Sequence, residues 1–261
     1  MIKKLMKYDI KKMTKILVYF YVISLSLAIL TRLINIGKNI QLIAIIGQVF
    51  AGLTYSAIAS ILINTFIHIL KVFLTNFYKD ESYLTHTLPV TKNQLLLSKY
   101  ISGLIVIISS VLVILLSLFI MLYSKDFANA LKIFIEQSIT GFNIPIWLFL
   151  VIMALLVFAQ ICAMISMAFT TIVKSNMYNS KRAIKALMWF VIYYFGAILV
   201  TVILAVIIFA ISGNISELGA KTLSQNSLLT LIILALGCYV IYAIYYYFLC
   251  RKLFNQGVNV D

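Results

Sequence analysis

The stretch Phe77–Lys99, FYKDESYLTHTLPVTKNQLLLSK, is a polar segment between two long apolar runs, 42–70 and 100–123. The whole chain has 261 residues, of which 64% are hydrophobic and only 11% are charged. A soluble globule of this size has too little interior to hide so many apolar side chains. The composition therefore predicts an integral membrane protein, in which this segment lies outside the bilayer and joins two membrane spans.

A short helix is predicted inside this segment. Asp80 and Ser82 carry side-chain oxygens that can accept hydrogen bonds from the free amides at a helix start. Leu84 and Leu88 lie one helical turn apart, and Pro89 disfavours helical backbone at the residue before it. We therefore expect a helix of about two turns at most, which ends before Pro89.

A second helix start follows directly. Thr91 and Gln94 form a Thr-x-x-Gln capping box, and Val90 and Leu95 occupy the positions of a hydrophobic staple around it. This pattern predicts that a helix begins near Lys92 and continues into the next membrane span.

Six apolar runs are long enough to cross a hydrocarbon core of about 30 Å, and they must be helical because lipid offers the backbone no hydrogen-bond partners. The fold class is thus all-α, with one transmembrane domain over 1–261. The predicted spans are 16–34, 42–70, 100–123, 146–173, 186–211 and 228–249. Residues 1–15 alternate apolar and lysine residues at helical spacing, which predicts an amphipathic helix at the membrane interface. A further amphipathic helix is predicted over 126–138.

The distribution of positive charge predicts the orientation. Of the 21 Lys and Arg residues, 16 lie in the two termini and in the second and fourth loops. Such a bias marks the cytoplasmic side, so both termini are expected there. The excess of Lys and Arg on the cytoplasmic side accounts for the net charge of +14, and no nucleic-acid partner is needed to explain it.

The segment Asp80–Ser102, DESYLTHTLPVTKNQLLLSKYIS, resembles the loop between the second and third spans of type-2 ATP-binding-cassette (ABC) permeases, which export drugs, polysaccharides and lantibiotic-like peptides. The resemblance implies that the short helix is a coupling helix, which docks on a separate cytoplasmic ABC ATPase that binds ATP and Mg. It also implies a second permease copy or a similar permease, a bacterial-type plasma membrane, and contact of the 1–15 helix with the ATPase. The residues that would couple to the ATPase are Asp80, Glu81, Tyr83, Leu84, Thr85, His86, Thr87, Leu88 and Pro89.

The residues themselves offer little catalytic chemistry. All seven acids lie outside the six predicted spans, which disfavours a proton- or sodium-coupled carrier. The sequence contains no G-x-x-x-x-G-K-[ST] loop, and the three cysteines have no metal-ligand spacing. We therefore predict a transport subunit that is not an enzyme, with no catalytic residue, metal or cofactor of its own.

A few polar residues inside the spans are candidates for a substrate path. Asn64 and His68 lie on one face of the second span. Gln160 is the residue of the fourth span whose side chain is least favourable in lipid. Asn64 and His68 could equally form hydrogen bonds between helices, and that packing role is the favoured one. Tyr239, with Tyr242 and three further tyrosines, crowds toward one end of the last span, which is typical of an aromatic belt.

The aliphatic and aromatic side chains of the predicted spans indicate an amphipathic or apolar substrate, such as a peptide, an antibiotic or a lipid-like molecule. The same side chains also suit helix packing alone. The alternative function is a membrane protein that works without nucleotide: a channel, a small carrier or an immunity protein. An integral membrane enzyme is a third and poorer possibility.

Overall fold

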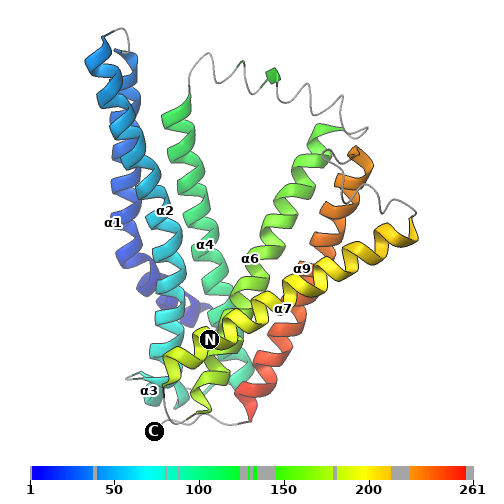
Figure 1. Ribbon diagram of the computed structural model, residues 1–261. Coiled ribbons are helices and arrows are strands. Elements are labelled where there is room, and N and C mark those ends of the chain that lie inside the picture. Colours follow the sequence, from blue (N-terminus) through cyan, green and yellow to red (C-terminus); the bar gives the residue numbers. More distant parts are fainter. Residues whose placement is uncertain are drawn as a thin grey trace. The chain divides into compact units, whose positions relative to one another are not determined.

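Figure 1 shows a computed structural model of the chain, which describes residues 2–37, 40–79, 81–87, 89–123, 129, 132–133, 145–178, 181–212 and 224–256. All secondary-structure elements given there are helices, and six of them are long and apolar enough to cross a membrane. The prediction of an all-helical protein with six candidate spans is therefore confirmed. The predicted helix over 126–138 lies almost entirely outside the described residues.

The chain forms two compact units, 1–131 and 132–261. Unit 1 contains α1 (Ile2–Ile36), α2 (Gln41–Tyr78), α3 (Ser82–His86) and α4 (Lys92–Leu122). Unit 2 contains α6 (Ile146–Asn176), α7 (Arg182–Ile211) and α9 (Gln225–Asn255).

In unit 1 the long helices α1, α2 and α4 pack side by side (Figure 1). An apolar cluster of Ile58, Ile61 and Ile114 is buried between them. Pairs of small polar side chains also join the helices along their length. These hydrogen bonds are Ser24–Ser117 at 3.1 Å, Thr31–Thr54 at 2.8 Å, Tyr21–Ser110 at 2.6 Å and Thr65–Ser110 at 2.8 Å. Hydrogen bonds of this kind hold helices together in lipid, where apolar surface alone gives little driving force.

The helices extend beyond the apolar runs. α1 covers both the predicted 1–15 helix and the 16–34 span in one element, and α2 has 38 residues and ends at Tyr78. At about 1.5 Å per residue, α2 is close to 57 Å long, well over the ~30 Å of a hydrocarbon core. Hydropathy marks only the apolar part of such a helix, because polar residues at its ends continue the same backbone hydrogen bonds.

In unit 2, α6 and α9 make the closest pairing (Figure 1). Thr170 Oγ1 donates to the carbonyl oxygen of Tyr246 at 2.8 Å, and an apolar cluster of Met167, Ala197 and Tyr246 joins all three helices. On α7 only Ala197 and Phe209 are buried among the described residues, so this helix is the most exposed of the three.

Lys181, at the start of α7, has φ 52° and ψ 41°, a left-handed conformation that strains a side chain with a Cβ atom. We expect Lys181→Gly to raise the free energy of unfolding by about 0.5–1 kcal/mol, because relief of strain exceeds the entropy that glycine gains when unfolded. Denaturation in mixed detergent micelles measures this change. Lys185→Gly, inside α7, is the matched control and should lower the stability by about 1 kcal/mol.

Candidate functional site

The short helix α3 is attached to the end of α2. The amide of Glu81 donates to the carbonyl oxygen of Thr75 at 3.3 Å, and the amide of Ser82 donates to that of Lys79 at 2.8 Å. Glu81 is the N-cap residue and makes no side-chain capping bond, and Ser82 is the first helical residue. The sequence thus predicted this helix correctly, but Ser82 lies inside it and does not cap it.

The start of α4 is as predicted. The amide of Gln94 donates to Thr91 Oγ1 at 3.3 Å, and the amide of Thr91 donates to Gln94 Oε1 at 3.2 Å, so the capping box is complete. It fixes the direction in which the chain leaves the connecting segment, because both residues lose freedom at the helix start.

The two faces of α3 differ sharply. Ser82 and Thr85 are buried, and Thr85 Oγ1 donates to the carbonyl oxygen of Glu81 at 2.8 Å. Tyr83 and Leu84 point away, with 77% and 67% of their surface exposed. Thr87 and Pro89 are also exposed, whereas Asp80, Leu88 and the side chain of His86 lie outside what the structure describes. A helix of five residues therefore presents two adjacent large apolar side chains to its surroundings.

A buried ion pair lies near α3. Lys99 Nζ of α4 donates to Asp9 Oδ1 of α1, and the two side chains are 1% and 5% exposed. Asn76 Nδ2 of α2 donates to the same carboxylate oxygen at 3.3 Å. The other oxygen, Asp9 Oδ2, has no hydrogen-bond partner within the described residues. This cluster joins the ends of three long helices at one buried point.

A second, half-exposed ion pair extends this cluster to the segment that carries α3. Lys12 Nζ donates to Glu81 and, at 3.4 Å, to Asn76 Oδ1. Lys12 lies three positions after Asp9 and so on the same face of α1. A continuous series of polar contacts thus runs from α4 through α1 and α2 to the first turn of α3.

These residues border an open groove of about 600 Å³. Its lining carries more positive than negative charge, because it holds five lysines and two acids. The lining residues are Lys4, Leu5, Tyr8, Asp9, Lys11, Lys12, Lys15, Asn76, Glu81, Thr85 and Lys99. Sequence reasoning named Glu81 and Thr85 here but missed the Asp9–Lys99 pair. The available signal was that Asp9 is the only acid in a lysine-rich helix.

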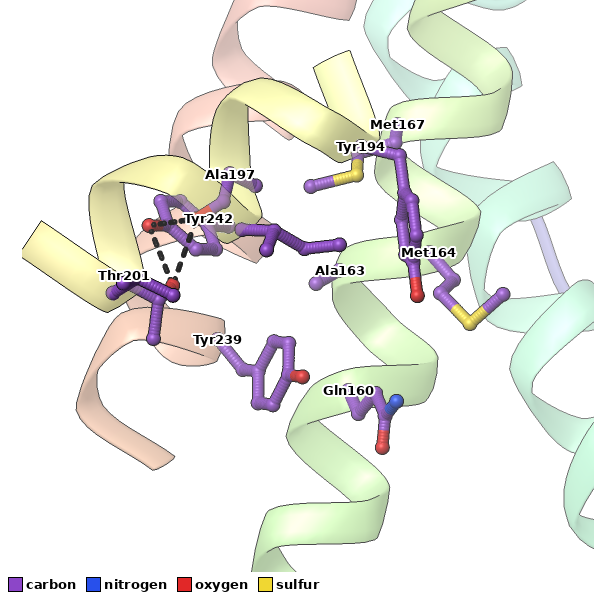
Figure 2. A pocket seen from close by; sticks show the side chains of 11 residues that line it. Gln160, Ala163, Met164, Met167, Tyr194, Ala197, Thr201, Tyr239 and Tyr242 are labelled. Atoms are coloured by element: carbon purple, nitrogen blue, oxygen red, sulfur yellow. Dashed lines mark hydrogen bonds between the residues drawn. The ribbon is translucent and has the colours of Figure 1, made fainter. Parts of the chain in front are cut away.

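A separate cavity of about 190 Å³ lies among the three helices of unit 2 (Figure 2). Gln160, one of the predicted substrate-path residues, lines it together with Tyr194, Tyr239 and Tyr242. Tyr239 and Tyr242 were assigned to an aromatic belt from the sequence, and the structure places them in this cavity. The hydroxyl of Tyr242 donates to the carbonyl oxygen of Ala197 at 3.0 Å.

The other two predicted path residues, Asn64 and His68, lie on α2 in unit 1 and border neither of these two cavities. Asn64 Nδ2 donates to the carbonyl oxygen of Ser60 in its own helix at 2.8 Å. One N–H of the Asn64 amide is therefore bonded within α2, and the substrate-path and interhelical roles of Asn64 stay predictions.

Comparison with protein-family models, with curated proteins and with solved structures found no match to this chain.

We predict that Lys99→Met lowers the free energy of unfolding by about 3–5 kcal/mol, because it leaves the Asp9 carboxylate buried without its partner. Thermal unfolding of the purified chain in detergent provides the measurement. Asp9→Asn combined with Lys99→Met should recover part of the loss, since no charge then remains buried.

Lys12→Met is the matched control, because Lys12 is 40% exposed and its pair with Glu81 is screened by solvent. It should cost less than about 1 kcal/mol. An equal loss for Lys12→Met and Lys99→Met would contradict the assignment of the Asp9–Lys99 pair as the stabilising contact.

Proposed function

We propose that this chain is the membrane-spanning permease subunit of an ABC transporter, in which a separate cytoplasmic ATPase hydrolyses ATP. The observation that supports this most is the exposed pair Tyr83 and Leu84 on α3, a short helix anchored by hydrogen bonds to the end of α2. The resemblance of Asp80–Ser102 to the coupling loop of type-2 permeases points to the same role. The transporter pairs this chain with a second permease and with two ATPases.

The contacts around α3 suit the transmission of force. Closure of the ATPases pushes α3, and the backbone hydrogen bonds of Glu81 and Ser82 pass that displacement to α2. The ion pair of Lys12 with Glu81 passes it to α1, and the buried pair of Asp9 with Lys99 passes it to α4. Packed helices move as rigid bodies, so the three helices shift together and switch access between the two sides of the membrane.

The proposed orientation follows from the same role, because α3 has to face the compartment that holds the ATPase. Both termini then lie in the cytoplasm, as the positive-charge distribution predicts. The basic groove beside α3 lies at the inner membrane surface, where its lysines meet anionic lipid head groups. The cargo is an amphipathic or apolar molecule that leaves the cell.

Tyr83→Glu and Leu84→Glu should each weaken association with the ATPase about thirtyfold or more, as loss of a central apolar contact in an interface does. The measurement is the amount of ATPase that co-purifies with the tagged chain from its native host. Ile36→Glu is the matched control, because Ile36 is 76% exposed and is the last residue of α1, whereas the contacts with the segment of α3 lie near the first residues of α1. The proposal is wrong if no ABC ATPase co-purifies with the unmodified chain, or if all three variants retain it equally.

The orientation is tested with single cysteines. We expect Tyr83→Cys to react with a membrane-impermeant maleimide in inside-out vesicles and not in intact cells, because α3 faces the cytoplasm. Ile36→Cys, at the other end of α1, should show the reverse. Background reaction is low, since Cys238 and Cys250 are buried and Cys162 is half-buried. Labelling of Tyr83→Cys in intact cells would rule out docking on a cytoplasmic ATPase.

A further inference from the structure

The cavity of unit 2 brings together three polar side chains from the middle of three long helices. Gln160 lies within about three residues of the midpoint of α6, and the same holds for Tyr194 in α7 and Tyr239 in α9. All three residues also lie inside apolar runs that are predicted to cross the bilayer, 146–173, 186–211 and 228–249, so their side chains are expected at membrane depth. Figure 2 shows the amide of Gln160 and the hydroxyls of Tyr194 and Tyr239 directed toward the same opening.

These three groups differ from the other polar groups of the cavity. Thr201 Oγ1 donates to the carbonyl oxygen of Ala197 at 2.8 Å and lies 3.1 Å from the hydroxyl of Tyr242, so that corner of the cavity is internally satisfied. The side chains of Gln160, Tyr194 and Tyr239 form no hydrogen bond within the described residues. At membrane depth an unpaired amide or hydroxyl costs several kcal/mol, and a bound molecule that pairs with these groups removes that cost.

The other residues that line the cavity indicate the charge, polarity and size of the molecule that it can bind. Among the residues that border the cavity none is charged, so an ionic group would be buried without a counter-charge. Met164, Met167 and Val202 form apolar walls suited to a ring or an alkyl group. The volume of about 190 Å³ is well above that of one water and is comparable with an engineered cavity of ~150 Å³ that binds benzene.

We propose that this cavity is a binding site for the uncharged polar end of an amphipathic molecule, with phenol as the smallest ligand of that class. The ring packs between Met164 and Met167, and the hydroxyl group exchanges hydrogen bonds with Gln160 and the two open tyrosine hydroxyls. The site belongs to this chain with or without an ATPase. Under the proposed function it receives the polar end of the cargo.

The test is photoaffinity labelling of the purified full-length chain in detergent. The probe is a phenol that carries a photoreactive diazirine, and the matched probe is the same molecule without the hydroxyl group. We expect the phenol probe to label residues around Gln160, Tyr194 and Tyr239, and an excess of phenol to displace it while benzene or benzoate does not. The probe without a hydroxyl should label the exposed apolar faces of all helices without saturation.

Two variants test the hydrogen bonds. Gln160→Leu and Tyr239→Phe should each weaken the displaceable labelling about threefold to tenfold, the effect of losing one neutral hydrogen bond. Tyr239→Phe keeps the ring and therefore the packing. Asn64→Leu is the matched control, because it removes an amide that is bonded within α2, and it should change nothing.

The inference is overturned if the labelling is spread along the helices, if benzene displaces the probe as well as phenol does, or if Gln160→Leu and Tyr239→Phe label like the unmodified chain. This assay contains no ATPase, so its outcome is independent of whether the chain associates with one. Absence of a co-purifying ATPase would contradict the proposed function but would not contradict this binding site.

Discussion

The arrangement of unit 1 depends on the buried pair of Asp9 and Lys99. Removal of two charges from water costs several kcal/mol each, and this cost is offset only if the charges meet each other and further hydrogen bonds. Here the amide of Asn76 donates a further hydrogen bond to the carboxylate oxygen that Lys99 contacts, so the beginnings of α1 and α4 and the end of α2 have to meet at one point. A slide of α1 along its neighbours would separate the charges. The pair therefore fixes the register of three long helices that apolar contact alone would leave free to slip.

Weaker polar contacts hold the remaining parts of α1, α2 and α4 in register in the same way. Along α1 the hydrogen bonds of Tyr21, Ser24 and Thr31 reach α4 or α2 at successive levels, and each links hydroxyl groups of two neighbouring helices. Unit 2 is held differently, by close packing of α6 against α9 and by the bond of Thr170 to the backbone of Tyr246. There the side chains of Gln160, Tyr194 and Tyr239 line a cavity and make no hydrogen bond within the described residues.

The sequence was sufficient for the features that depend on neighbouring residues. The six long helices, the short helix before Pro89 and the capping box of Thr91 with Gln94 all follow from local patterns of apolarity and helix-start chemistry. The Asp9–Lys99 pair joins residues 90 positions apart, and no local pattern shows which of 21 basic residues an acid will meet. Of the residues that line the cavity of unit 2, Gln160 could be singled out from the sequence because an amide is unusual in an apolar run. Tyr239 could not be singled out, because a tyrosine near other tyrosines suits a membrane interface equally well.

A helix of five residues has no independent stability, since helix formation has a costly nucleation step that so short an element does not repay. The conformation of α3 therefore depends on its attachment to Thr75 and Lys79 and on the burial of Ser82 and Thr85. This dependence has a mechanical consequence under the proposed function. A partner that holds Tyr83 and Leu84 cannot move α3 without moving the helix ends to which it is bonded. Close packing transmits displacement instead of absorbing it, so a small movement at α3 becomes a movement of all three long helices of unit 1.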